Sequence, residues 1–426
     1  MKLETTMTDT SPAKRAPLLA LLSANTISLV GSTLTMIALP WFVLQTTGSA
    51  AKTGLAGFFL FLPAFIAGIF GGTLVDRFGY KRVSIAADII SGLAIALIPL
   101  FYYTIGLAFW QLLALVFLAG LLEIPGLTAR RSLLPELAVM ARVRLERVNA
   151  SFEAIQHLAL LLGPPIAGIL IVWLGASNVL WIDAATFVAS ALIVAPAIPA
   201  SLAAAKQATT SRYRDELRAG LRFLRHDRLL LSLAVCLAIT NFFGNTLFAV
   251  LLPVYVKQTF DSPTVLGLMA SSYGAGALVG AMIFGAIGHR LPRRATWIAA
   301  FTVSPLLFWA LTTSLPLPVV LAAIALVGVV GGPTNPLLVT IRHERIPKEL
   351  RGRVFSTFSA IAQVAAPLGV LCAGGLVEAI GLRTTVLILA VCAQTVGFAM
   401  FFVPAFHAMG ASAPLAVPRS EFVESS

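Results

Sequence analysis

Charged residues are scarce in this chain. Only 11% of its 426 residues are Asp, Glu, Lys or Arg, whereas 58% are hydrophobic. A soluble fold of this length has no interior large enough for that much apolar surface, so the composition excludes a soluble protein. Cysteine is also rare. Cys236, Cys372 and Cys392 fall within long apolar stretches, which predicts neither a disulfide framework nor a metal-binding knuckle.

Short alternating strands are missing as well, which excludes a transmembrane β-barrel. The apolar residues instead form blocks of about 20, the length at which a helix crosses a bilayer core of ~30 Å. The sequence therefore predicts an all-α membrane protein with twelve transmembrane helices. We expect them at about 17–46, 54–75, 84–104, 108–128, 152–174, 178–198, 229–256, 264–288, 295–313, 316–338, 354–380 and 384–405.

The basic residues follow the predicted loops, which argues against nucleic acid as a partner. All but three of the 30 Lys and Arg residues fall on one side of the twelve spans, and the exceptions are Lys52, Lys257 and Arg383. The positive-inside rule then predicts a multi-pass protein of the cell (inner) membrane with both termini in the cytoplasm. Met1–Ala16 is polar and lacks a small-residue cleavage site, so we expect no cleaved signal peptide.

One long polar connection divides the spans into six and six. This predicts an N-terminal bundle at 1–198, a cytoplasmic linker at 199–228 and a C-terminal bundle at 229–426. Leu and Phe recur at helical spacing between Arg214 and Arg225, which predicts an amphipathic helix at the membrane surface. A solvated linker helix is the alternative.

A segment after the second span is repeated after the eighth. Gly72–Arg82 reads GTLVDRFGYKR, and Gly285–Arg294 reads GAIGHRLPRR, 213 residues later. Each has a glycine near a helix end, a polar residue before Arg, a turn-forming residue and then basic residues. Because transporters are often built from duplicated units, the repeat indicates two pseudo-symmetric six-helix bundles.

The first copy resembles the loop 2–3 signature of the major facilitator superfamily, G-x-L-x-D-R-x-G-x-K/R-R. The resemblance implies the major facilitator fold and a conformational latch, in which Asp76 holds its loop against the N-terminus of a helix in the other half. His289 replaces the Asp and Pro292 the second Gly in the second copy, so we expect a one-sided latch. The latch residues are Gly72, Asp76, Arg77, Gly79, Lys81 and Arg82.

The predicted fifth span carries the sequence LGPPIAG at 162–168. It is similar to the Gly-Pro motif of antiporters in this superfamily, with Gly163, Pro164 and Gly168 present and a single closing Gly where the motif has a pair. Proline kinks a helix and glycine permits close approach, so the motif predicts a gate helix between the halves. Plain helix packing is the alternative.

Further stretches resemble the bacterial macrolide and siderophore exporter branch, the drug:proton antiporters of the superfamily. They are Ile37–Trp41, Gly48–Ala50, Trp181–Phe187, Leu217–Arg225 and Arg351–Val354. The resemblance covers nearly the whole chain. It implies export of a drug or siderophore coupled to proton entry.

No constellation of an enzyme stands out. Gly48–Thr53 superficially suggests a phosphate loop but lacks the Gly before Lys52, so we expect no ATP hydrolysis. No metal or cofactor is predicted either. An ion gradient is then the energy source, and the expected partners of the monomer are a small-molecule substrate, protons and membrane lipid.

Few ionisable side chains fall inside the predicted spans, and each is a functional candidate because hydrocarbon is costly for a charge. The candidates for proton coupling are Glu123, Asp88, Asp183 and the pair Glu153 and His157, which lie four apart on one helix face. We expect no Lys or Arg inside a span to neutralise these carboxylates, which favours the protonated form that a proton carrier needs. Glu123 is the first choice, because it precedes a Pro-Gly step on a span that lines the central cavity in the superfamily.

Each of the other candidates has a structural alternative. For Asp88 it is a hydrogen bond near the cytoplasmic loop that supports the Asp76 latch. Asp183 is better interpreted as an interhelical hydrogen-bonding group. Glu153 suits a solvated acid at a helix start, and His157 alone suits a satisfied core histidine.

Amides beside aromatic rings are the candidates for substrate contact, because rings supply area and amides supply orientation to a large amphipathic ligand. Helix packing is the alternative for each. With Glu123 they are Asn25, Asn241, Phe242, Phe243, Asn245, Asn335 and Gln363.

The leading hypothesis is proton-coupled export of a hydrophobic or amphipathic small molecule by alternating access. Nutrient symport is one alternative, for which we expect a more polar cavity and embedded Arg. A non-transporting sensor or assembly protein on the same scaffold is the other.

Overall fold

The computed structural model describes residues 14–199, 213–313, 315–347 and 350–410, without the side chains of 67–76, 213–217, 219 and 352. Eleven helical stretches in this part of the chain are long and apolar enough to cross a membrane. The twelfth is α2, of which Ala50–Ile66 is the apolar part described in full. Each stretch overlaps one predicted block, which confirms the all-α fold with twelve transmembrane helices.

Six helices without interior breaks make the N-terminal bundle, and each contains at least one interior proline. Their apolar sides pack on one another, and the interior includes Leu39, Ile98 and Leu180. The helices are α1 (Ala16–Thr47), α2 (Ala50–Phe78), α3 (Tyr80–Thr104), α4 (Phe109–Ala141), α5 (Leu145–Leu174) and α6 (Ala176–Ala197).

The C-terminal bundle has the same number of spans, but several of them are interrupted. The ninth span breaks before α12 and the tenth before α14, and a proline stands at each break, Pro305 and Pro333, where its missing N–H leaves one helix hydrogen bond unmade. The elements are α8 (Arg228–Thr246), η2 (Leu247–Leu251), α9 (Leu252–Thr259), α10 (Pro263–Ile287), η3 (Gly288–Arg290), α11 (Arg293–Val303), α12 (Leu306–Leu311), α13 (Leu317–Gly331), α14 (Thr334–Arg345), α15 (Arg351–Gln363), α16 (Ala365–Ile380), α17 (Leu382–Ala399), η5 (Met400–Phe402) and η6 (Pro404–Gly410).

The turn between the fifth and sixth spans is alike in the two halves. Gly175 joins α5 to α6 with φ 87° and ψ 151°, and Gly381 joins α16 to α17 with φ 81° and ψ 161°. Residues other than glycine rarely adopt a positive φ, so the glycine at each place permits the same one-residue turn. The match supports the internal repeat that the loop motifs indicated.

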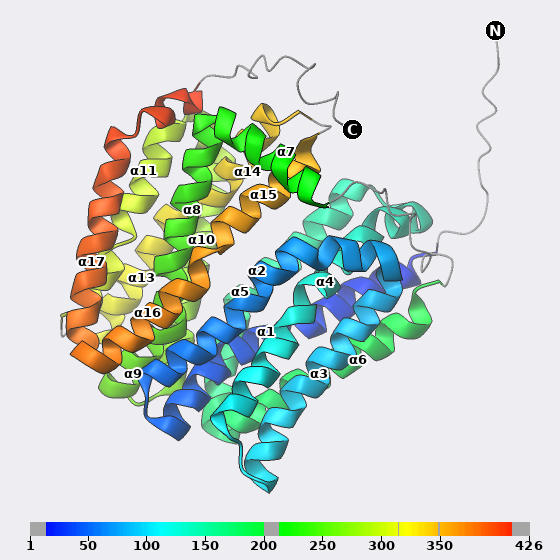
Figure 1. Ribbon diagram of the computed structural model, residues 1–426, viewed down its shortest axis with the longest axis horizontal. Helices are drawn as coiled ribbons and strands as arrows, with labels where there is room; N and C mark the ends of the chain where they lie inside the picture. Colours follow the sequence, from blue (N-terminus) through cyan, green and yellow to red (C-terminus); the bar gives the residue numbers. More distant parts are fainter. Residues whose placement is uncertain (1–13, 200–212, 314, 348–349, 411–426) are drawn as a thin grey trace.

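The amphipathic helix expected in the linker is present as α7 (Tyr213–His226). Figure 1 shows it lying across α15, and its apolar residues Phe223 and Leu224 are buried in the C-terminal half. Gly220 fits closely against the backbone of Arg353, so α7 is docked on protein along this face. Residues 200–212 of the linker lie outside the described residues, and the predicted domain bounds stay a prediction.

The two halves touch mainly through two helix pairs, α2 with α16 and α5 with α10. We call the end of the molecule with α7 terminus-proximal and the end with α9 terminus-distal (Figure 1). In the terminus-distal half of the molecule, Gly54 of α2 lies against Gly374 of α16, and Gly168 of α5 lies against Pro263 of α10. A Cβ at Gly54 would stand 2.7 Å from the Gly374 Cα, so the backbones approach as closely as glycine allows.

Candidate functional site

A buried ion pair lies inside the N-terminal bundle. Arg130 of α4 is 5% exposed and Asp88 of α3 is 2% exposed, and the guanidinium contacts the carboxylate directly. Ser190 of α6 donates a second hydrogen bond to Asp88 (2.7 Å). The prediction that no Lys or Arg lies inside a span is therefore wrong, and Asp88 binds Arg130 rather than a group near the loop.

The error comes from the predicted end of the fourth span. We expected it near residue 128 because Arg130 and Arg131 read as a loop, whereas α4 continues to Ala141. The helix tolerates both arginines because successive side chains leave a helix about 100° apart, so one can be buried while the next is exposed. Arg130 turns into the bundle, and Arg131 turns outward to Glu153 (2.8 Å).

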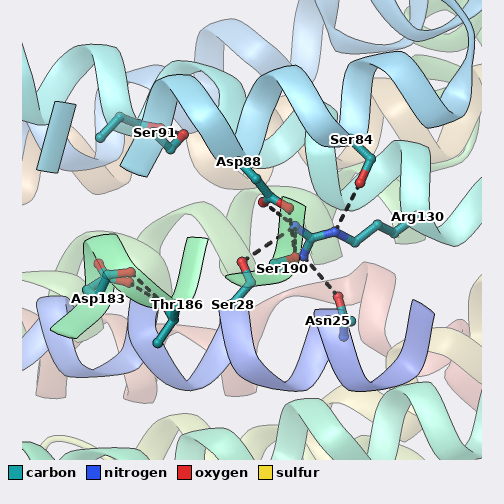
Figure 2. A network of polar contacts seen from close by, with 10 residues as sticks. Asn25, Ser28, Ser84, Asp88, Ser91, Arg130, Asp183, Thr186 and Ser190 are labelled. Carbon is teal, nitrogen blue, oxygen red and sulfur yellow. Dashed lines mark hydrogen bonds and ion pairs between the residues drawn. The ribbon is translucent and has the colours of Figure 1, made fainter. Parts of the chain in front are cut away.

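Hydroxyl and amide oxygens complete the surroundings of the guanidinium, as Figure 2 shows. Arg130 donates to Ser84 of α3 (3.3 Å) and, at 3.4–3.5 Å, to Asn25 and Ser28 of α1 and to Ser190 of α6. One arginine thus connects four helices of the bundle, and its charge is compensated by Asp88. Asn25, predicted to contact substrate, belongs to this network instead, and its Nδ2 has no hydrogen-bond partner among the described residues.

Glu123 lies beside the same small cavity as the ion pair. With Asp88, Arg130, Asn25 and Ser32 it lines this cavity of about 30 Å³. A cavity of this size holds about one water molecule. Asp88 and Arg130 both act electrostatically on Glu123. Glu123, the first choice for a proton carrier, thus shares a cavity with the buried pair and is exposed to its charges.

Asp183 lies deeper in the same bundle. It is 1% exposed and accepts hydrogen bonds from Thr35 of α1 (2.5 Å) and Thr186 (3.3 Å). The interhelical hydrogen bond favoured for this residue is present, and Gly31 of α1 leaves the space in which Asp183 packs. Because Glu123 also acts on Asp183 electrostatically, three carboxylates and one arginine form a connected group. A proton-carrying role for Asp183 stays a prediction.

Glu153 and His157 do not form the expected pair in the described contacts. Both are exposed, and Glu153 is bound to Arg131, with side chains that are 52% and 48% exposed. The interpretation of Glu153 as a solvated acid agrees with this exposure. No contact described for either residue joins it to Asp88, Glu123 or Asp183.

The C-terminal bundle contains a larger cavity of about 400 Å³. Ligand pockets commonly measure about 300–1,000 Å³, so this cavity has room for a drug-sized molecule. Four predicted substrate contacts line it, namely Asn241, Phe243, Asn335 and Gln363, whereas Phe242 and Asn245 do not. Aromatic residues that the sequence did not single out complete it: Phe248, Tyr273, Phe301 and Phe308.

The polar groups of this cavity are held by contacts between helices. Asn241 of α8 donates from Nδ2 to the carbonyl oxygen of Ala362 (2.8 Å) and to Oε1 of Gln363 (3.3 Å). Phe243 and Phe308 pack edge to face with ring centroids 6.1 Å apart. The lining residues include no Asp, Glu, Lys, Arg or His, so the cavity offers rings, amides and hydroxyls but no charge.

The latch motif is only partly described. For Gly72 and Asp76, near the end of α2, the structure describes only the backbone. Arg77 is exposed and stacks on Phe78, and Gly79 joins α2 to α3 with φ 85°. Lys81 donates to the carbonyl oxygen of Ile198 (2.6 Å), and Arg82 is exposed.

The Gly-Pro motif of α5 lies where the halves meet. Gly168 contacts the backbone of Pro263, and the carbonyl oxygen of Pro164 contacts Gly267, both on α10. Gly163 instead lies against Thr33 of α1, inside its own bundle. Two of the three predicted gate residues are thus at the boundary between the bundles, and the gate role itself stays a prediction.

Known proteins resemble this chain along nearly its whole length. The family model of the Major Facilitator Superfamily matches residues 21–243 and 234–424. The multidrug efflux pump Tap of Mycobacterium tuberculosis (strain ATCC 25618 / H37Rv) is 35% identical over 401 residues, which are 93% of this chain and 95% of that protein. The macrolide efflux protein A of Streptococcus pyogenes is 24% identical over 373 residues, 85% of this chain and 89% of that protein.

Solved structures share the fold at low identity. The nucleoside transporter NupG is similar with a TM-score of 0.70 and 15% identity, over 92% of this chain and 98% of that one. A bacterial homolog of the human lysosomal transporter Spinster, solved inward-facing and unoccupied, gives a TM-score of 0.71 and 14% identity, over 94% and 98% of the two chains. These structures agree in fold, and the family match, together with the relative that is 35% identical, shows that the chain belongs to the major facilitator superfamily of membrane transporters.

Proposed function

We propose that this transporter exports hydrophobic or amphipathic small molecules from the cell in exchange for protons. The observation that carries the proposal is the uncharged cavity of about 400 Å³ in the C-terminal bundle, lined by rings and amides. Such a lining gains energy from apolar area and loses none to an unpaired buried charge. The names of the relatives, a multidrug and a macrolide efflux protein, support the direction of transport.

Proton coupling belongs, in this proposal, to the N-terminal bundle. Glu123, Asp88 and Asp183 provide carboxylates away from lipid, and the cavity beside Glu123 is large enough for a water molecule that passes a proton. Arg130 prefers a charged partner, so proton uptake by one carboxyl group changes how strongly the arginine holds the others. That change is the physical link that we propose between protonation and movement of the bundle helices.

The orientation that we propose places the terminus-proximal end in the cytoplasm. The bias of Lys and Arg toward that end supports it. The closest backbone approaches between the halves that we have described, Gly54 with Gly374 and Gly168 with Pro263, lie in the terminus-distal part. With this orientation the structure is closed to the outside and corresponds to the inward-facing state of alternating access.

Symport of an anionic nutrient is less well supported, although Arg130 removes one argument against it. We had expected symport to bring an embedded arginine. The guanidinium of Arg130, however, is bound by Asp88 and by side-chain oxygens of three further helices, and it does not line the large cavity. An anionic substrate would have to displace Asp88 to reach it.

The test uses purified full-length protein in proteoliposomes with an imposed proton gradient. Transport of a macrolide or a lipophilic cation is expected to follow the gradient, and Glu123→Gln is expected to abolish gradient-driven transport while substrate binding persists. Glu153→Gln is the matched control, because Glu153 is an exposed carboxylate bound to Arg131. Full coupling in Glu123→Gln, or its loss in Glu153→Gln alone, would remove Glu123 from the mechanism.

A further inference from the structure

A contact between the halves at the terminus-distal end uses a carboxylate from one half and a helix start from the other. Glu378 of α16 accepts a hydrogen bond from the hydroxyl of Ser49 (3.1 Å) and one from the backbone N–H of Ala51 (3.2 Å). Ser49 precedes the first residue of α2, and its Oγ accepts from the backbone N–H of Lys52 (3.1 Å). Ser49 is therefore the N-cap of α2, and Glu378 binds that cap from the opposite bundle.

The charge of Glu378 suits this position. The first turn of a helix carries unpaired N–H groups and a partial positive charge, which an acidic side chain stabilises. The first turn of α2 contains no acidic residue of its own. The C-terminal half thus supplies the anion that α2 lacks, and it can do so only while the two halves are together at this end.

The face of α16 that carries Glu378 packs closely against α2. Val370, Gly374 and Glu378 follow one another at a spacing of four, so they lie on one side of the helix. Val370 packs against Gly57, and Gly374 packs against Gly54. The glycine pair brings the helices close enough for Glu378, one turn further along, to reach the start of α2.

We propose that Glu378, Ser49 and the N–H of Ala51 form a distal latch, which stabilises the closed terminus-distal end and must open in each transport cycle. Glu378 acts as a positioning residue in this role, because it sets the balance of conformations without contacting substrate. The inference rests on the proposed alternating-access function. Glu378 of the second half thus binds a helix start in the first half. The Asp76 motif implies the reverse arrangement at the opposite end of the molecule.

The test measures conformation directly, so that it does not depend on transport. Spin labels at Ile105→Cys and Thr313→Cys, in full-length protein whose three native cysteines are replaced by Ser, report the distance between exposed terminus-distal loops of the two halves. In lipid nanodiscs, Glu378→Ala is expected to raise the ratio of separated to closed distances by about two- to fivefold, the size of an anion's effect at a helix start. Glu378→Gln, which keeps an acceptor oxygen, is expected to give a smaller rise.

Two further variants decide between a latch and a general effect of charge. Ser49→Ala added to Glu378→Ala is expected to cause little further change, because both variants remove the same contact. Glu146→Gln is the matched control, since Glu146 is exposed and pairs with Arg144 in its own half. Unchanged distances in Glu378→Ala, or an equal shift in Glu146→Gln, would overturn the latch. A failure of proton-driven export with these shifts intact would instead count against the proposed function.

Discussion

Arg130 is the side chain on which the interior of the N-terminal bundle depends most. It lies in the apolar part of the bundle, yet it has Asp88 and oxygens from α1, α3 and α6 around it. A buried pair of this kind adds little net stability compared with apolar residues, but losing one partner leaves an uncompensated charge. Substituting one partner should therefore lower the free energy of unfolding by far more than the intact pair contributes to it.

Arg130→Met is expected to lower the free energy of unfolding by about 3–5 kcal/mol, because Asp88 stays buried without its partner. The double variant Arg130→Met with Asp88→Asn is expected to recover most of this loss. Thermal unfolding of the purified protein in detergent measures both. Each variant should be compared at one detergent and salt concentration.

The neighbouring arginine provides the control. Arg131→Met removes the same charge from the same helix, but its partner Glu153 is exposed, so the loss is expected to stay under about 1 kcal/mol. Equal effects of the two substitutions would show that burial of the Arg130 pair does not matter.

The sequence revealed the buried carboxylates but not their partner. Asp88 and Asp183 are isolated acids inside clear apolar blocks, so the pattern alone marks them. Arg130 stands beside Arg131, and two adjacent arginines are typical of a cytoplasmic loop. Only the packing of α3, α4 and α6 shows that one arginine turns inward. One signal was available: Asp88 is a buried acid, and a buried acid calls for a basic partner on a neighbouring helix.

At the scale of elements, glycines decide where the two halves meet. The pair Gly54 and Gly374 permits contact between α2 and α16, and Gly168 permits contact between α5 and α10. The sequence singled out Gly168 through its motif, whereas Gly54 and Gly374 resembled the many other glycines of apolar spans. Partner helices and close approaches depend on three-dimensional packing, which a single-chain pattern does not contain.

Gly374→Ala is expected to open the terminus-distal end and slow transport, because the new Cβ would stand 2.8 Å from the Cα of Gly54. Gly375→Ala is a closely matched control. That residue is next in the same helix and gains the same helix propensity, about 1 kcal/mol, but nothing lies within 4 Å of its Cβ position. Transport rates in proteoliposomes and the loop-to-loop distance measure the difference between the two variants.

Comparable results for the two variants would contradict the argument. If both reduce transport, α16 tolerates no added side-chain volume, and the α2 contact is not the cause. If neither does, the close approach of Gly54 and Gly374 does not limit the closed state.

At the scale of the whole molecule, the sequence predicted the architecture well. Span number, all-α class and the two-bundle repeat follow from apolar blocks and a duplicated loop, and these signals are strong because the bilayer fixes helix length. The loop motif also indicated the superfamily. The interruptions of the C-terminal spans and the cavity that they surround were not predicted, because they arise from the way the helices pack.

The orientation of the molecule is the remaining expectation at this scale. With the native cysteines replaced by Ser, Ile105→Cys is expected to react with a membrane-impermeant maleimide in intact cells, because Ile105 is exposed in the terminus-distal connection of α3 and α4. Arg144→Cys, in the exposed terminus-proximal connection of α4 and α5, is expected to react only after the membrane is opened. The physical reason is the excess of Lys and Arg at the terminus-proximal end, which holds that end in the cytoplasm. The opposite labelling pattern would show the opposite orientation, with the closed end of the structure facing the cytoplasm.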